Sequence, residues 1–353
     1  MQKIKLAIIF GGSSSEYSVS LHSASSAISN VDENKYDLTF IGISKEGAWY
    51  YYGGTREGIE HDTWQSDPSL CPLSVDLSGR GGFIKLEKEQ NTFIKVDCVF
   101  PILHGKNGED GTLQGLLTLA KIPFVGCDAL CSSTSMDKQV THIICEAAGI
   151  KMAPYMGFLA SANFDYEAAF KQLHQKITFP AFVKPANAGS SYGITKIKDD
   201  YNEFKAAMLL AFKHDCKVIV ETGIDGFEVG TAVMGNDYDN LTVGEIDQIL
   251  TENDFFDFEA KYALQNTKIV CPAHISEDLT LQIKTNARSI YKAMGCSGMS
   301  RIDMFVASDG QVYFNELNTI PGFTTTSRYP SMMQAIGIDF STLIDRLVAL
   351  ALE

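Results

Sequence analysis

Residues 301–322 read RIDMFVASDGQVYFNELNTIPG, and this segment carries the strongest structural signal in the chain. Asp309-Gly310 lies between two runs of strand-forming residues. An Asp-Gly pair in that position is typical of a tight β-hairpin turn. The segment therefore predicts two antiparallel strands joined by a two-residue turn.

That turn sets which residues lie opposite each other on the two strands. Asp303 pairs with Glu316, and Arg301 pairs with Asn318. Because side chains alternate between the two faces of a strand, these four groups project from one face. Two carboxylates and an amide oxygen suit Mg²⁺, which binds oxygen ligands together with phosphate and water. A cross-strand salt-bridge ladder is the alternative interpretation of the hairpin alone.

Length and composition restrict the class of protein. At 353 residues the chain exceeds one typical hydrophobic core, so we expect two or three domains. A formal charge of −14 argues against nucleic acid or an anionic membrane as the main partner. No apolar run reaches the roughly 18 residues that span a bilayer, and we expect a cytoplasmic protein. The eight cysteines lack metal-ligand spacing and predict neither zinc nor disulfides.

Alternating strand and helix patterns predict an α/β protein with three units. The apolar strand 3–10 runs into a small-residue loop and a helix near 19–28, with further strands near 38–43 and 96–103, which favours a doubly wound first domain. Residues 54–90 show no periodicity and are expected to form a surface excursion. The pattern restarts after Gly126 and again near 221.

Several short motifs carry chemistry suited to a phosphorylated ligand. The strand ending in Lys184 continues as a glycine- and serine-rich loop, in which backbone amides and a lysine can approach phosphates. Lys138 at a helix start supplies a second cation, and Glu221 and Glu228 flank a turn where they can accept from a ribose or an adenine amine. A surface loop, a helix cap and solvated turn charges are the respective alternatives.

Two further motifs point to a cleft. His104 follows an apolar strand, and ligands of open α/β sheets gather beyond the carboxyl ends of strands. Glu109 and Asp110 in the same loop can also cap a helix. Residues 255–262 hold three phenylalanines and a tyrosine, which either pack permanently or close as a lid over a ligand.

Together these segments resemble the D-alanine–D-alanine ligase family of the ATP-grasp superfamily, over essentially the whole chain. The resemblance rests on seven collinear motifs: GGSSSE at 11–16, HG at 104–105 with GEDGTLQG at 108–115, SMDK at 135–138, KP at 184–185 with GSS at 189–191, FFDFEAKY at 255–262, RID at 301–303, and NELNTIPG at 315–322.

The resemblance implies a three-domain ATP-grasp ligase. Its parts would be an N-terminal substrate-binding, Rossmann-like doubly wound domain at 1–126 and two α+β domains enclosing ATP. The central ATP-grasp domain would span 127–220, and the C-terminal ATP-grasp and metal-binding domain 221–353. A homodimer is expected, since family members are commonly dimers.

The resemblance also implies the roles of individual residues. A D-alanine carboxylate would attack ATP to give an acyl phosphate, which a second amine then attacks. The residues expected in catalysis are Glu16, Ser190, Tyr262, Arg301 and Gly322. Those expected to hold ATP are Lys138, Lys184, Ser191, Glu221, Ile224, Glu228, Phe255 and Lys261. Two Mg²⁺ ions, for which Mn²⁺ can substitute, would bind Asp303, Glu316 and Asn318. The amino-acid substrates would contact His104, Asp247, Phe256, Ser327 and Arg328.

Arg328 indicates which amino acid is the second substrate. Family members that join two alanines usually carry leucine or methionine there, whereas arginine, with Phe256 and Asp247, looks like the D-alanine–D-serine ligases of the vancomycin-resistance group. A hydroxymethyl group can form a hydrogen bond with a fixed polar partner, whereas a methyl group cannot. Retention of Lys261-Tyr262 argues against the relatives that use D-lactate. The alternative is an alanine-specific enzyme in which Arg328 makes a surface salt bridge.

Two other classes conflict with the sequence. A nicotinamide-dependent oxidoreductase would need a third glycine after Gly11-Gly12 and an acidic residue that ends a second strand about 20 residues further on, and the sequence lacks both. A non-catalytic nucleotide sensor would not need the full set of metal and phosphate residues.

Overall fold

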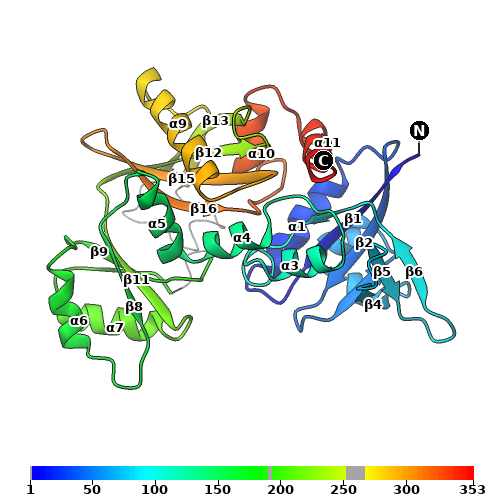
Figure 1. Ribbon diagram of the computed structural model, residues 1–353, viewed down its shortest axis with the longest axis horizontal. Coiled ribbons are helices and arrows are strands. Elements are labelled where there is room, and N and C mark those ends of the chain that lie inside the picture. The colour runs from blue at the N-terminus through cyan, green and yellow to red at the C-terminus, as the bar shows by residue number, and fades with distance from the viewer. Residues whose placement is uncertain (1, 190–192, 252–266) are drawn as a thin grey trace.

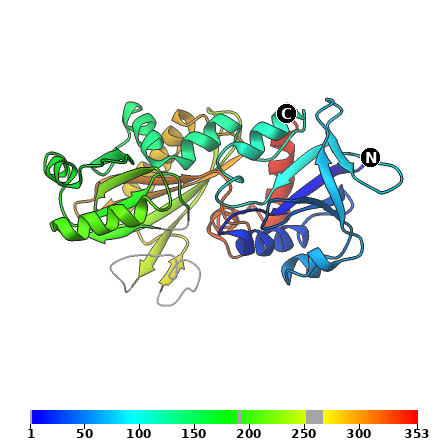
Figure 2. The same cartoon turned by 90° about the horizontal axis from the view of Figure 1, so that it is seen from below.

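The computed structural model describes residues 2–189, 193–251 and 267–353, which build three β-sheets with helices packed on them (Figure 1). Seen from below, the sheets follow one another along the long axis, with the five-stranded sheet between the other two (Figure 2). The predictions that fall on Ser190, Ser191 and residues 255–262 lie outside the described residues.

The first sheet has seven strands in the order β6-β5-β4-β3-β2-β1-β7. Its strands are β1 (Ile4–Gly11), β2 (Tyr36–Ile43), β3 (Trp49–Tyr52), β4 (Cys71–Val75), β5 (Gly82–Lys85), β6 (Thr92–Lys95) and β7 (Cys98–Pro101). β1 pairs in parallel with both β2 and β7, and the remaining pairs are antiparallel. The helices of this part are α1 (Tyr17–Ile28), α2 (Arg56–Glu60), the 3-10 turn η1 (Trp64–Ser66) and α3 (Thr112–Leu119).

One sequence prediction about this sheet is wrong. Residues 54–90 are not a surface excursion, because they supply α2, η1 and two strands that extend the sheet. These strands have only five and four residues, which is too short for a period of two to stand out in the sequence. Trp64 of this segment is fully buried and packs edge-on against Phe10.

Both faces of β1 are covered, which explains its continuous apolar sequence. Leu6, Ile8 and Phe10 join a core with α1 and with α11 (Phe340–Ala351), whereas Ala7 and Ile9 face α3 in a second core.

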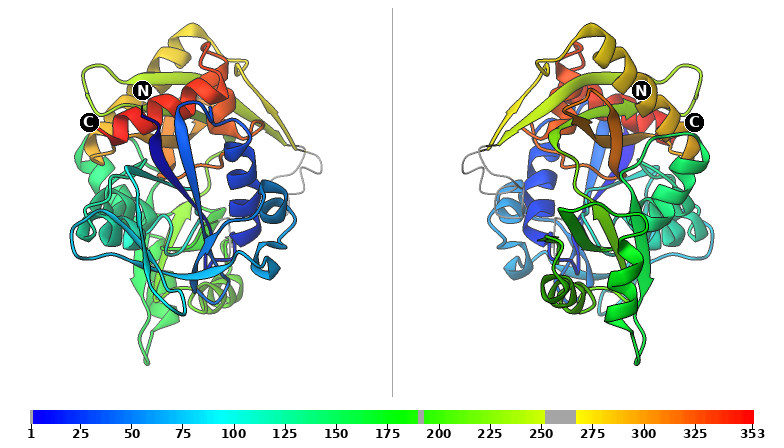
Figure 3. Two further views of the ribbon diagram at one scale, coloured as in Figure 1. Left: turned by 90° about the vertical axis from the view of Figure 1, so that its right-hand side faces the viewer. Right: turned by 90° about the vertical axis from the view of Figure 1, so that its left-hand side faces the viewer.

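The second sheet is antiparallel, in the order β10-β9-β11-β8. It contains β8 (Tyr155–Leu159), β9 (Ala181–Pro185), β10 (Thr195–Ile197) and β11 (Lys217–Thr222), and helices α6 (Tyr166–Leu173) and α7 (Tyr201–Ala211) cover one face. Figure 3 views the molecule from its two ends, with the first sheet nearest on the left and the second nearest on the right. Helices α4 (Ala129–Met136) and α5 (Lys138–Ala147) lead from the first sheet to the second.

The third sheet is also antiparallel, in the order β14-β13-β12-β15-β16. It contains β12 (Gly226–Met234), β13 (Thr242–Thr251), β14 (Thr267–Val270), β15 (Met299–Ala307) and β16 (Val312–Asn318), with α9 (Glu277–Ala293) on one face and α10 (Arg328–Gln334) on part of the other. We propose that the three sheets are the cores of the domains expected at 1–126, 127–220 and 221–353, although β11 extends two residues beyond the second boundary.

The hairpin β15–β16 differs from its prediction in one respect. Three residues, not two, form its turn, since the Ala307 N–H donates to the Gln311 carbonyl (2.9 Å) and Gly310 takes a positive φ of 81°. A bulge at Asn315 compensates, because Met304 pairs with Phe314 while Asp303 pairs with Glu316. The predicted pairs 303–316 and 301–318 are therefore confirmed.

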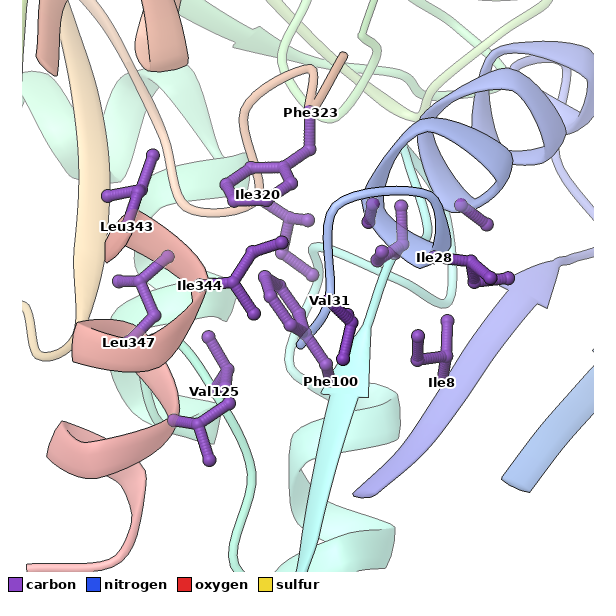
Figure 4. Close-up of a cluster of buried hydrophobic side chains, with 14 of the residues drawn as sticks. Ile8, Ile28, Val31, Phe100, Val125, Ile320, Phe323, Leu343, Ile344 and Leu347 are labelled. Carbon is purple, nitrogen blue, oxygen red and sulfur yellow. The ribbon is translucent and has the colours of Figure 1, made fainter. Parts of the chain in front are cut away.

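The last helix, α11 (Phe340–Ala351), packs on the first sheet although it follows the third along the chain (Figure 4). Leu343, Ile344 and Leu347 face the core around Phe100. The loop before α10 joins the same core through Phe323, whose ring lies edge-on to Phe100 with 5.1 Å between centroids. The first and third sheets therefore share a continuous apolar core.

Phe323→Ala should lower the free energy of unfolding by about 3–5 kcal/mol, because it empties a buried aromatic site in this shared core. Urea denaturation followed by circular dichroism measures the change. Leu281→Ala is the matched control, since Leu281 is 69% exposed on α9 and its loss should change stability little. Equal effects of the two substitutions would contradict the importance of the shared core.

Candidate active site

The predicted metal residues occupy one face of the hairpin β15–β16. Asp303 is fully buried, and it accepts from Arg301 Nε (2.9 Å) and Nη2 (2.7 Å). The Asn318 Nδ2 donates to the same carboxylate at 3.2 Å. Glu316 lies opposite Asp303 in the register. Burial opposes the charge of Arg301, but the carboxylate of Asp303, with a smaller contribution from Glu316, raises the pKa of Arg301.

These donors fit a divalent cation. Two carboxylates and an amide oxygen lie on adjacent strands, and such hard oxygen ligands match Mg²⁺. Asp303 is buried among polar groups rather than in an apolar core, so its charge is stabilised in the folded protein.

Arg328 lies in the same polar region, at the start of α10. Its Nε and Nη2 donate to the two oxygens of Asp247, at 2.7 and 2.8 Å. Nη1 donates to Glu228 at 3.0 Å, and Nη2 lies 3.3 Å from Asp303 Oδ1. Burial opposes the charge, but the carboxylates of Asp247, Asp303 and Glu228 outweigh burial and raise the pKa of Arg328 above its ordinary value. The alternative of a surface salt bridge does not describe this side chain, which is 11% exposed.

The predicted nucleotide residues of the second sheet form a buried charge cluster. Lys184 on β9 donates to Glu221 on β11 at 2.5 Å, and His142 Nε2 on α5 lies 2.9 Å from the same carboxylate. Burial would raise the pKa of Glu221, but the charges of Lys184 and His142 outweigh it and hold this pKa below its ordinary value. Lys138 begins α5 and donates to the Ala188 carbonyl at 2.7 Å.

A pocket lies between His142 of this cluster and the end of β16. It brings Lys138 on α5 together with the ends of Glu316 and Asn318 on β16. The rest of the described lining comes from three segments: residues 135–142, residues 188–189 and residues 315–319, with Glu109. Cationic and oxygen-bearing groups thus face a common space, as a phosphate–metal ligand requires.

Two predicted residues of the first domain lie near the loop that follows β16. His104 Nδ1 is 3.1 Å from the Ile320 carbonyl, and Nε2 is 3.2 Å from Ser23 Oγ. Burial lowers the pKa of His104, against the opposing charge of Glu16. The Glu16 carboxylate lies close to two glycines. A Cβ built at Gly105 would lie 2.4 Å from Glu16 Oε2, and one built at Gly189 would lie 3.0 Å from the same atom. Glu16 is thereby close to both the first domain loop and the glycine-rich loop.

The remaining predicted residues lie at the edges of this region. Ile224 occupies the turn between β11 and β12, and Ser327 precedes Arg328. Ser327 Oγ accepts from the Thr324 N–H at 3.0 Å, and a Cβ built at Gly322 would lie 3.2 Å from it. Gly322 and Ser327 therefore belong to the same tight loop.

Matches to family models identify the chain. Residues 5–127 match the model described as D-ala D-ala ligase N-terminus, and residues 144–349 match D-ala D-ala ligase C-terminus. The chain belongs to the D-alanine–D-alanine ligase family. Ligases of this family form a peptide bond with ATP and use divalent metal ions.

Relatives of this ligase carry two kinds of name. A D-alanine–D-alanine ligase of Caldicellulosiruptor bescii is 42% identical over 358 residues, covering 100% of this chain and 96% of its own. The vancomycin C-type resistance protein VanC1 of Enterococcus gallinarum is 42% identical over 349 residues, covering 99% and 98%. The crystal structure of the VanG D-Ala:D-Ser ligase from Enterococcus faecalis superposes with a TM-score of 0.91 at 49% identity, covering 99% of this chain and 100% of that one. Within the part of this ligase that the structure describes, no helix is long and apolar enough to cross a membrane.

Two residues of the candidate site were not predicted from the sequence in the positions that the structure gives them. His142 contacts Glu221, and its only sequence signal is the i, i+4 spacing from Lys138 on one helical face. Glu109 was expected only as a possible helix cap. Instead it accepts from the N–H groups of Gly105 (2.8 Å) and Ile320 (3.2 Å) and ties the first domain to the loop after β16. Asp110 accepts from the Thr112 N–H, but it is not the cap of α3, whose N-cap is Gly111 without a side-chain hydrogen bond.

Stability should depend on pH through Glu109. Burial and the charge of Glu16 raise its pKa from 4.5 to about 8, although the two N–H donors favour the charged form. Between these values the folded protein binds more protons here than the unfolded chain, so this contribution to the free energy of unfolding is present below pH 4.5 and is lost as pH rises through 8.

Glu109→Gln should therefore gain stability relative to the parent as the pH is raised from about 5 to 8.5. Chemical denaturation at several pH values measures the difference between the two proteins. Glu89→Gln, at an exposed loop position, is the control and should follow the parent. A pH-independent difference for Glu109→Gln would contradict the raised pKa.

Lys184→Met should lower the free energy of unfolding by about 3–5 kcal/mol, since it leaves the buried Glu221 carboxylate without its lysine. Adding Glu221→Gln in the same chain should recover part of the loss. Denaturation curves of both variants test this, with Lys213→Met as the exposed control. Without recovery in the double variant, the loss cannot be assigned to the unpaired carboxylate.

Proposed function

We propose that this ligase joins D-alanine to D-serine with ATP, through a D-alanyl phosphate intermediate, and so makes a peptidoglycan precursor associated with vancomycin resistance. The observation that carries the proposal is the guanidinium of Arg328, fixed by Asp247 and Glu228 in a buried polar region. A fixed hydrogen-bond donor favours a substrate that carries a hydroxyl. The VanG ligase, named D-Ala:D-Ser, supports the same assignment.

The burial of Arg328 makes it a suitable specificity element. Its charge is neutralised by carboxylates on three neighbouring strands, so it holds one position without a substrate. A preorganised donor loses little entropy when a hydroxyl binds. An alanine methyl would leave that donor unused, and a site with an unpaired buried polar group binds such a ligand less well.

The alternative product is D-alanyl-D-alanine. The Caldicellulosiruptor ligase with that name is 42% identical to this chain, the same value as for VanC1, so overall identity does not separate the two activities.

The described residues can divide the catalytic work. Lys138 and Lys184 would neutralise the phosphates, while Glu221, Ile224 and Glu228 would contact adenine and ribose. Two Mg²⁺ ions on Asp303, Glu316 and Asn318 would supply electrostatic stabilisation of the transferred phosphoryl group. We infer that the remaining ATP contacts come from Ser191, Phe255 and Lys261.

The two amino-acid substrates would contact residues of the first domain and residues of the third sheet with the loop that follows it. Glu16 would pair with the ammonium of the first D-alanine, next to His104. Arg301 and the Gly322 N–H would stabilise the oxyanion that forms when the second amine attacks, an interaction worth about 3–4 kcal/mol in comparable acyl-transfer sites. Glu16, Ser190 and Tyr262 would form a hydrogen-bonded set. Phe256 and Ser327 would contact the second substrate with Arg328 and Asp247. A homodimer remains a prediction.

With ATP, Mg²⁺, D-alanine and excess D-serine at neutral pH, the main dipeptide should be D-alanyl-D-serine. Mass spectrometry of the products distinguishes it from the alanine dimer. Arg328→Met should reduce the serine-to-alanine product ratio by roughly 10- to 100-fold, the equivalent of one hydrogen bond to a charged group.

Two further variants keep this test interpretable. Arg328→Met/Asp247→Asn removes the carboxylate charge that the single variant leaves buried, and it should show the same change in ratio. Arg346→Met alters an exposed arginine on α11 and should leave the ratio unchanged. Formation of the alanine dimer alone by the parent protein, or an unchanged ratio in Arg328→Met, would overturn the proposal.

A further inference from the structure

Gly230 occupies the centre of the polar row that holds Arg328. In the sheet register it pairs with Asp247 on β13 at one side and with Asp303 on β15 at the other. Residues paired across neighbouring strands point to the same face, so a side chain at 230 would project between the two carboxylates. The Arg328 guanidinium takes that place instead. A Cβ built at Gly230 would lie 2.4 Å from Arg328 Nη2 and 2.6 Å from Asp303 Oδ1.

We propose that Gly230 is a specificity-determining residue for the second substrate, because its missing side chain creates the space in which Arg328 is held. This inference rests on the proposed role of Arg328 in serine selection. Gly230 itself would touch no substrate and would act by positioning the guanidinium.

Space, and not backbone conformation, accounts for a glycine here. Glycine in the interior of a strand is disfavoured, since it contributes no packing and loses more conformational entropy than other residues. Gly230 also lacks the positive φ that fifteen other described glycines have. The position is buried in the middle of β12, where a larger residue would normally pack.

The atoms that a Cβ would meet identify which group would move. At Gly226, on the same strand, the nearest atom is the backbone carbonyl oxygen of Val306 at 2.0 Å, so substitution there would distort the sheet. At Gly230 all three nearest atoms belong to side chains. Asp303 is restrained by Arg301 and Asn318, whereas Arg328 ends a long flexible side chain. The guanidinium would therefore be displaced.

Displacement would remove particular contacts. Nη2 is the atom closest to the built Cβ, and it makes both the 2.8 Å bond to Asp247 Oδ1 and the 3.3 Å contact with Asp303. The Nε bond to Asp247 and the Nη1 bond to Glu228 do not involve Nη2. The bidentate pair with Asp247 would become a single contact, and the Nη2 donor would lose its defined direction.

Gly230→Ala should lower the ratio of D-alanyl-D-serine to D-alanyl-D-alanine by about tenfold or more, equivalent to one charged hydrogen bond. The ratio is measured by mass spectrometry with both amino acids present, so a general loss of turnover cancels. Gly115→Ala is the control, because a Cβ at that helical position meets nothing within 4 Å. The melting temperature of each variant, taken by calorimetry, reports whether the fold is retained.

A double-mutant cycle with Arg328→Met separates positioning from a general effect. If Gly230 acts through Arg328, Gly230→Ala should produce no further change in the product ratio once residue 328 is methionine. An unchanged ratio in Gly230→Ala alone, or an equal additional change in the methionine background, would overturn the inference. If Arg328→Met itself leaves the ratio unchanged, the proposed function fails instead.

Discussion

The bulge at Asn315 is the constraint on which the site depends. Before it, Val312 and Phe314 point into the core under α9; after it, Glu316 and Asn318 point to the opposite face. A regular strand would place all four on one side, because its side chains repeat every two residues. One inserted residue thus allows a single short strand to pack a hydrophobic core and also to carry the oxygen-bearing side chains that we propose bind the metal.

The polar face of the third sheet brings together residues that are far apart in the sequence and for which we propose different roles. Arg328, assigned to the amino-acid substrate, contacts Glu228 and Asp303, which are assigned to the nucleotide and the metal. These oppositely charged groups lie close together in a buried setting, where electrostatic interactions are strong. We infer that the side chains that bind the nucleotide, the metal and the second substrate form one set of contacting groups. A substitution at one of them would therefore change the positions or interactions of the others.

Local features such as strands and turns could be predicted from the sequence, whereas contacts between segments far apart in the chain could not. The pairing of Asp303 with Glu316 was predicted from a two-residue turn, and it holds because the bulge at Asn315 offsets the additional turn residue. The short strands within 54–90 were missed because they have only five and four residues and the segments around them are rich in glycine, serine and aspartate, as loops are. Glu109 bonds to the N–H of Ile320, 211 residues away, and no local pattern encodes that contact. The clearance at Gly230 likewise exists only once three strands are assembled.

The position of α11 has a consequence for biosynthesis. The helix that covers β1 and β7 is made from residues 340–351, so it leaves the ribosome after the strands of all three sheets. Until then the apolar surface around Phe100 has no permanent cover, and exposed apolar surface on a nascent polypeptide promotes aggregation. Burial of the apolar surface around Phe100 is thus delayed until the third sheet has been synthesised, and a chain that stalls before residue 340 would expose this surface to chaperones and proteases.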